Sequence, residues 1–150
     1  MTFALTGNDT IIINDRPLAD FGTGDICTLT FAENLTDMQV GKNGNAIITY
    51  NPQGKKVDVE LKLLAGSADD KFLNSSLLSL SKDFPSFSLI KGSFGKRIGD
   101  GTGAVNNITY TLEGGTFAKN IDAKENVEGD KEQAQVLYRL TFASSKREIA

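Results

Sequence analysis

The sequence predicts a mainly β fold, a β-sandwich or open barrel with one flanking α-helix, in a single domain over residues 1–150. Three observations carry this prediction. Apolar and polar residues alternate with a period of two along several short segments, as in strands that bury one face. Clusters of Gly, Asn and Asp separate these segments and mark turns. A single stretch, over about 68–80, has the spacing of an amphipathic helix instead.

Three segments show the strand alternation most clearly: 57–63 (VDVELKL), 108–113 (ITYTLE) and 136–142 (VLYRLTF). Such strands turn one face to the core and the other to water. We therefore expect their polar positions to be exposed or, in an assembly, to line a channel. These positions are Asp58, Glu60, Lys62, Thr109, Thr111, Glu113, Arg139 and Thr141.

Four further segments have weaker strand signals, with β-branched residues that suit a pleated, half-covered surface. They are 10–14 (TIIIN), 25–31 (DICTLTF), 46–51 (AIITYN) and 86–92 (SFSLIKG). Turns are expected where Gly, Asn and Asp gather, at 20–25, 41–45, 51–56 and 99–103.

The helix over about 68–80 has a recognisable start. Ser67 is placed to cap the first turn, and Asp69 and Asp70 follow where the helix dipole favours negative charge. Pro85 forces an extended restart of the chain, because the residue before a proline avoids the helical region. The apolar positions that carry the helical spacing are Phe72, Leu73, Leu77 and Leu80.

Composition excludes several classes of protein. The chain has no histidine, so it has no Ser-His-Asp triad, no Cys-His pair and no His-ligated zinc. A net charge of −3 argues against a protein that grips nucleic-acid phosphates. No apolar run approaches the roughly 20 residues that span a bilayer, so membrane insertion is not expected. The single cysteine, Cys27, alternates with Leu29 and Phe31 and is interpreted as a small core residue.

The Gly-rich stretch 92–103 (GSFGKRIGDGTG) suggests a ligand loop at first sight. A phosphate loop needs Ser or Thr after its lysine and a helix behind it, whereas Arg97 follows Lys96 and a strand is expected next. A calcium loop needs acids or amides at alternating positions after Asp100, and these are missing. We therefore interpret the stretch as a flexible or hairpin-like connection, a mobile arm that reaches a neighbouring subunit.

Other catalytic patterns are weak. Ser79 and Lys82 form an isolated S-x-x-K without the companion motifs of penicillin-recognising enzymes. The acids of the segment 119–135 are interleaved with lysines, as in a solvated loop; they are Asp122, Glu125, Glu128, Asp130 and Glu132. No enzymatic activity and no cofactor or metal is predicted.

The order of several motifs along the chain carries a resemblance. The motifs are NDRPLADFGTGDICTLTF (14–31), VGKNGNAIITYN (40–51), GSADDKFLNSSL (66–77), GSFGKRIGDGTGAVNNITYTLEGGTF (92–117) and NVEGDKEQAQVLYRLTFASSKREI (126–149). Read in this order they resemble the tail-tube proteins of contractile-tailed bacteriophages. The resemblance covers nearly the whole chain.

The resemblance implies a structural virion protein that forms hexameric rings stacked into the inner tail tube. Inner sheets of neighbouring subunits would join into one barrel, which removes the exposed edges of an open sheet. DNA would pass through without sequence-specific binding. The implied partners are the tail sheath, tape measure and baseplate proteins, and the implied location is the virion tail, assembled in the host cytoplasm.

Three segments are expected to contact neighbouring subunits, because they combine Gly-rich or charged sequence with reach: 41–56, 92–106 and 119–133. The candidate contact residues are Lys42, Asn43, Asn45, Gln53, Lys55, Lys56, Phe94, Lys96, Arg97, Asp100, Lys124, Glu125, Glu128 and Asp130.

Two alternatives stay open. One is the tube of a related contractile injection system, such as a bacteriocin or secretion tube, or another small tail protein. The other is a monomeric ligand-binding β-barrel or sandwich, which would need a pocket lined by aromatic and convergent polar groups.

Overall fold

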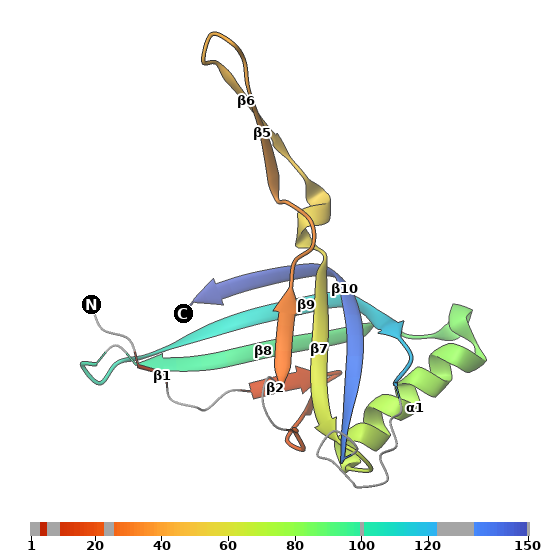
Figure 1. Ribbon diagram of the computed structural model, residues 1–150. Coiled ribbons are helices and arrows are strands. Elements are labelled where there is room, and N and C mark those ends of the chain that lie inside the picture. Colours follow the sequence, from red (N-terminus) through yellow and green to blue (C-terminus); the bar gives the residue numbers. More distant parts are fainter. Residues whose placement is uncertain (1–3, 6–9, 23–25, 100, 123–133, 150) are drawn as a thin grey trace, which may run out of the picture.

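The computed structural model describes residues 4–5, 10–22, 26–99, 101–122 and 134–149, and within them the fold is mainly β (Figure 1). One antiparallel sheet has the strand order β3-β2-β8-β9-β10-β7-β4, with β1 paired to β8, and β5 and β6 form a second sheet. The strands are β1 (Ala4–Leu5), β2 (Thr10–Ile13), β3 (Arg16–Pro17), β4 (Cys27–Thr30), β5 (Thr36–Val40), β6 (Ala46–Tyr50), β7 (Val57–Leu64), β8 (Ile90–Gly99), β9 (Val105–Lys119) and β10 (Gln135–Ile149).

The large sheet curls on itself without closing, so the expected mainly β fold is confirmed. The segment that follows β3 runs along the edge of β7. It thus brings the chain from one end of the open sheet toward the other. The Gly22 amide donates to the Lys62 carbonyl (3.0 Å), and the Leu64 amide donates to the Asp20 carbonyl (2.9 Å). These hydrogen bonds satisfy backbone amide and carbonyl groups of the connection, which lies outside the named strands.

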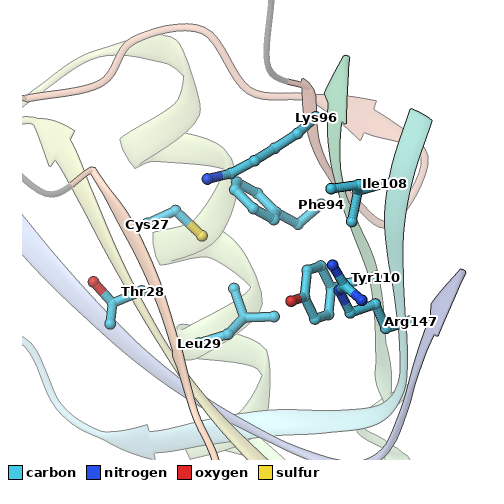
Figure 2. A pocket seen from close by; sticks show the side chains of 8 residues that line it. All are labelled: Cys27, Thr28, Leu29, Phe94, Lys96, Ile108, Tyr110 and Arg147. Carbon is cyan, nitrogen blue, oxygen red and sulfur yellow. The ribbon is translucent and has the colours of Figure 1, made fainter. Parts of the chain in front are cut away.

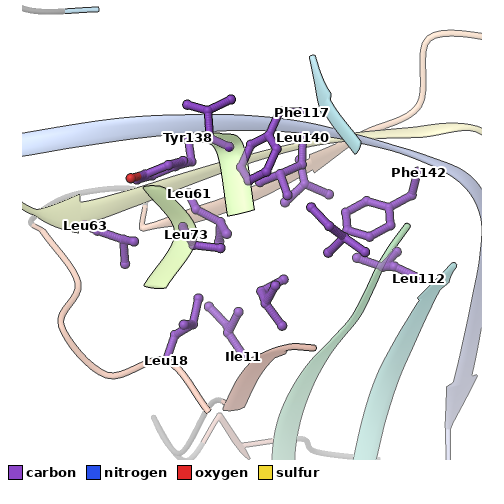
Figure 3. Close-up of a cluster of buried hydrophobic side chains, with 14 of the residues drawn as sticks. Ile11, Leu18, Leu61, Leu63, Leu73, Leu112, Phe117, Tyr138, Leu140 and Phe142 are labelled. Carbon is purple, nitrogen blue, oxygen red and sulfur yellow. The ribbon is translucent and has the colours of Figure 1, made fainter. Parts of the chain in front are cut away.

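The core lies inside this curl, under the helix α1 (Ala68–Lys82) (Figures 1 and 3). The period-two prediction is confirmed on β7, where Val57, Val59, Leu61 and Leu63 are all 2% exposed or less. On β10, Tyr138, Leu140 and Phe142 are buried against them. Leu73 and Leu77 of the helix complete the cluster. The apolar residues that alternate along the strands and those with helical spacing therefore pack into one hydrophobic core.

The predicted helix is confirmed, and its first turn does more than complement the helix dipole. Ser67 caps it, since its hydroxyl accepts from the Asp70 amide (3.2 Å). The buried Asp69 carboxylate accepts hydrogen bonds from the Ala19 amide (2.7 Å), the Asp20 amide (2.9 Å) and Arg16 Nε (3.1 Å). Asp69 therefore fastens the helix to the segment that narrows the sheet.

A second bond ties the same turn to β10. The buried Tyr138 hydroxyl donates to Asp70 Oδ1 (2.6 Å), and burial together with this carboxylate raises the pKa of Tyr138. The phenol therefore stays protonated and keeps its role as a hydrogen-bond donor.

The interpretation of 86–103 was wrong in two places. A 3-10 turn occupies Phe84–Ser86, and the strand starts only at Ile90 and runs to Gly99. Most of the supposed mobile arm is thus a strand, paired with β9 along one edge and with β2 and β1 along the other. Distant strands provide these backbone partners, so the local Gly-rich sequence could not reveal them. The turn itself is confined to the residues between β8 and β9, where Gly101 and Gly103 have positive φ.

Candidate assembly surfaces

The most unusual feature is the exposed hairpin, formed by β5 and β6 and their turn (residues 36–50). It projects from the body of the molecule, and among the described strands β5 and β6 pair only with each other (Figure 1). Every residue from 31 to 50 is exposed. An isolated two-stranded ribbon is only marginally stable in water.

One face of the exposed hairpin is apolar. The register places Met38 opposite Ile48 and Thr36 opposite Tyr50, so these side chains share a face with Val40. Asp37, Gln39 and Thr49 lie on the other face, with Ile47. Met38, Val40, Ile48 and Tyr50 are 53–64% exposed. A contiguous exposed apolar surface of this kind is typical of a protein–protein contact.

The base of the hairpin is held in place by a short 3-10 turn, Pro52–Lys55. The Asn51 amide donates to the Leu35 carbonyl (2.8 Å), and Asn51 Nδ2 donates to the Asn34 carbonyl (3.0 Å). Gly54 packs so closely that an added Cβ would lie 2.7 Å from the Leu35 Cα. The hairpin therefore leaves the body from a packed and hydrogen-bonded base.

The outer half of β10 offers a second surface, the free edge (residues 143–149). β10 pairs with β9 as far as Ile149, but its pairing with β7 ends at Phe142. Within the described part of the chain, no strand covers the other edge of β10 beyond that point. Unpaired amide and carbonyl groups along such an edge are a template for a strand of another chain.

A third surface is a cleft of about 410 Å³ between β4 and the three long strands β8, β9 and β10 (Figure 2). Phe94 and Tyr110 form part of its wall, with ring centroids 6.1 Å apart. Lys96 Nζ lies 5.5 Å from the Phe94 ring centre, and the Arg147 guanidinium carbon lies 5.9 Å from that of Tyr110. The other lining residues are Cys27, Thr28, Leu29 and Ile108.

The two cations of the cleft have no acidic partner among the residues that the structure describes. Neither Lys96 nor Arg147 forms an ion pair with any residue of the described chain. Cys27, half-buried against the core as its spacing predicted, also lines the cleft. Burial raises the pKa of its thiol to about 12, so this cysteine is a packing residue rather than a nucleophile.

The polar strand positions singled out by the sequence lie on the face away from the core. Arg139 lies opposite Glu60 in the register, 3.8 Å from its carboxylate, and its Nη1 reaches Asp122 at 3.2 Å. Thr141 is adjacent, with a buried hydroxyl that has no partner in the described chain. Asp58 and Lys62 flank Glu60 on this face, and Thr109, Thr111 and Glu113 pair with Glu148, Lys146 and Ser144. Whether any of these residues lines a channel stays a prediction.

The predicted contact residues fall in three places. Lys42, Asn43 and Asn45 form the tip of the exposed hairpin, and Gln53, Lys55 and Lys56 lie at its base. Phe94, Lys96 and Arg97 belong to strand β8 rather than to a loop, a correction that places Phe94 and Lys96 in the cleft. Asp100, Lys124, Glu125, Glu128 and Asp130 lie outside the described residues.

Sequence reasoning missed β5 and hence the apolar face of the hairpin. The signal was present, because Met38 and Val40 alternate with polar residues just before the turn 41–45. It also missed that Tyr110 and Arg147 share a cleft with Phe94, since strand pairing over a long sequence distance brings them together.

Other chemistry finds little support in the described residues. Ser79 and Lys82 line an open polar groove at the end of α1, and no hydrogen bond joins them there. No group of Cys, Asp or Glu among those residues could hold a metal ion. The helix α1 lacks the length and apolar character needed to cross a membrane, and the same holds for every other helix in that part of the chain.

The fold of this chain recurs in solved structures of other proteins. The chain is similar to the tube-terminating cap of the anti-feeding prophage (AFP), with a TM-score of 0.63, 10% identity, and 98% of this chain and 91% of that one covered. It is also similar to a chain of the PVC sheath–tube complex in its extended state (TM-score 0.60, 8% identity, coverage 98% and 90%). A chain of the PVC sheath/tube terminator gives a TM-score of 0.58, 9% identity and coverage of 97% and 94%.

At these identities the likeness shows a shared fold over nearly the entire chain. No model of a protein family matches the sequence, and no curated protein matches it either.

Proposed function

We propose that the chain is a structural subunit of the inner tube of a contractile tail, assembling with copies of itself into stacked hexameric rings. The observation that carries this proposal is the exposed hairpin, whose apolar face is not covered by any described part of its own chain. The fold that the chain shares with proteins of a tube cap, a sheath–tube complex and a sheath/tube terminator supports the same function.

The proposed assembly uses two of the surfaces described above. The free edge of β10 pairs with a neighbour in the ring, so that the sheets join into one barrel. The hairpin reaches a further subunit and covers its apolar face there. The subunit carries out no catalysis; its partners are the sheath, tape measure and baseplate proteins, and DNA passes along the channel without specific binding.

The proposed location is the tail of a virion, assembled in the host cytoplasm. The tube of an extracellular injection system is the alternative that the similar structures favour, since two of the three come from an extracellular contractile injection system. Two of the three are named as a cap or a terminator. A subunit that ends a tube would form single rings and would not polymerise by itself, whereas a tube subunit forms long stacks.

A concentration series tests the proposal. Sedimentation velocity of the purified chain should show a monomer at low concentration and rings or longer assemblies at high concentration. The double substitution Met38→Ser/Ile48→Ser removes apolar side chains from the hairpin face and should prevent the longer assemblies, because the contact of the hairpin with a further subunit is lost. The matched control Gln39→Ser/Thr49→Ser changes the opposite face and should assemble normally. A chain that stays monomeric at every concentration would instead favour a ligand-binding domain.

A further inference from the structure

The three long strands extend beyond the core as a ribbon whose two faces differ in chemistry. This outer ribbon consists of residues 93–98 of β8, 106–113 of β9 and 144–149 of β10, which pair in an unbroken register. It extends to the side of the molecule away from α1 (Figure 1). The proposed assembly joins such ribbons into a barrel but leaves open which of their faces lines the channel.

One face of the outer ribbon belongs to the cleft. Phe94, Ile108 and Tyr110 line the cleft from this side, and Leu29 of β4 lies across from them (Figure 2). Leu112 has the same orientation as Ile108 and Tyr110, because side chains two apart in a strand share a face. It is 3% exposed and belongs to the hydrophobic core. This face is therefore turned toward the body of its own subunit.

The opposite face of the outer ribbon is polar. Successive side chains in a strand point to opposite faces, so the residues between those of the cleft face point the other way. Each of them is a glycine or has a hydroxyl, amide or charged side chain. They form rows across the strands, and we call this set the polar face: Ser93, Thr111 and Lys146; Gly95, Thr109 and Glu148; Glu113 and Ser144; Arg97 and Asn107.

The charges of the polar face are balanced. Its basic side chains are Arg97 and Lys146, and its acidic ones are Glu113 and Glu148. Lys146 Nζ lies 2.7 Å from Glu148 Oε1, so these two charges neutralise each other. A nucleic acid is held by Lys and Arg side chains that neutralise its phosphates. A face without an excess of basic side chains therefore suits a polyanion that has to slide past.

Closure into a ring determines where each face points. When the free edge of β10 pairs with a neighbour, the outer ribbons of successive subunits form the wall of a barrel. β4 and the hydrophobic core lie on the cleft side of this wall. These bulkier parts lie outside the barrel, because the space available to each subunit increases with distance from the ring axis. The polar face then points toward the axis.

We propose that the polar face of the outer ribbon lines the channel of the assembled tube and lets a polyanion pass without holding it. The inference rests on the proposed self-assembly. It selects Thr109, Thr111 and Glu113 from the strand positions that the sequence suggested. The others belong to β7 and to the half of β10 that pairs with β7, and they are assigned outside the channel: Asp58, Glu60, Lys62, Arg139 and Thr141.

Cysteine labelling of assembled tubes tests this assignment. Thr111→Cys places a thiol on the polar face. The matched variant Thr30→Cys places one on an exposed position of β4, opposite Asp58 in the register. Both variants also carry Cys27→Ala, which removes the single natural thiol.

Two reagents of different size distinguish a channel from an outer surface. N-ethylmaleimide is small and should modify both variants in tubes. A maleimide on a long polyethylene glycol chain should modify Thr30→Cys in tubes but fail to modify Thr111→Cys, because the chain does not enter the channel. In dissociated subunits both reagents should modify both variants.

The charge balance has a test of its own. Glu113→Gln leaves the polar face with an excess of positive charge, so its tubes should retain short single-stranded DNA at about 50 mM salt and release it at about 200 mM. Unmodified tubes should retain none. The matched substitution Glu60→Gln should change retention little, since Asp122 still neutralises Arg139 beside it. Co-sedimentation of labelled DNA with the tubes measures retention.

The outcomes separate this inference from the proposed function. Tubes in which the long reagent modifies Thr111→Cys, or in which N-ethylmaleimide does not, would overturn the channel assignment and leave the tube function standing. Equal retention of DNA by Glu113→Gln and Glu60→Gln tubes would overturn the role of the charge balance. An unmodified chain that never assembles would overturn both proposals.

Circular dichroism and electron microscopy check that each variant folds and assembles. If Thr111→Cys does not form tubes, Thr109→Cys replaces it, since Thr109 lies in the next row of the polar face. The same labelling pattern is expected from it.

Discussion

Asp69 shows how one residue controls the shape of the molecule. Its carboxylate is buried and receives two backbone amides and the Arg16 guanidinium, so it joins the helix to the segment along β7. Burial by itself would raise the pKa of Asp69, but the hydrogen bonds from Ala19, Asp20 and Arg16 hold it below its usual value.

The lowered pKa of Asp69 predicts a loss of stability in acid. A carboxyl group whose folded pKa is depressed contributes stability above its unfolded pKa, and this is lost as the pH falls through the folded value. The loss should begin below the ordinary aspartate pKa of about 3.9. Asp69→Asn should lower the free energy of unfolding at pH 7 by about 2 kcal/mol. Urea unfolding at a series of pH values measures the free energy of unfolding of both proteins. If stability of the Asp69→Asn variant fell in acid as steeply as that of the unmodified protein, this account would be contradicted.

Gly115 allows another close contact, between β9 and the core. An added Cβ would overlap the Phe142 ring and lie 2.9 Å from the Ile90 carbonyl oxygen. Gly115→Ala should therefore destabilise the fold by about 1–3 kcal/mol, the usual cost of overpacking.

Gly95 provides the matched control for this prediction. It lies in the neighbouring strand, and an added Cβ there would approach no atom closer than 3.8 Å. Gly95→Ala should leave the urea midpoint nearly unchanged. Equal effects of the two substitutions would show that glycine flexibility, and not packing against Phe142, determines the cost.

At the scale of elements, the sequence predicted most where the pattern was local. The alternation in 57–63 and the cap at Ser67 depend on near neighbours along the chain, and both were recovered. Strand β8 was misread because its glycines carry no strand signal, and its backbone partners are distant in sequence. The cleft could not be foreseen for the same reason, since Phe94, Tyr110 and Arg147 meet only through sheet pairing.

The exposed hairpin should change its dynamics on assembly. In the monomer its backbone hydrogen bonds lie in a ribbon with no covering layer, so its amides should exchange with solvent rapidly. In the assembled form the amides of β5 and β6 should become strongly protected, while those of β7, already central in the sheet, should change little. Hydrogen exchange by mass spectrometry measures both states. A hairpin that exchanges equally fast in both would contradict a role in assembly.

At the scale of the whole molecule, three surfaces lie outside the packed core. The free edge of β10 and the cleft belong to the curled sheet, and the hairpin projects beside it as a second, two-stranded sheet. The fold is shared with proteins of sheath–tube assemblies. The proposed assembly would cover the hairpin and the free edge, and leave the core of each copy as it is.

The central claim is that copies of this chain assemble and cover the exposed hairpin. Cryo-electron microscopy of the protein at high concentration tests it directly. The account predicts stacked hexameric rings in which every hairpin lies against a neighbouring subunit. Particles that remain monomeric, or rings whose hairpins stay exposed to solvent, would contradict it.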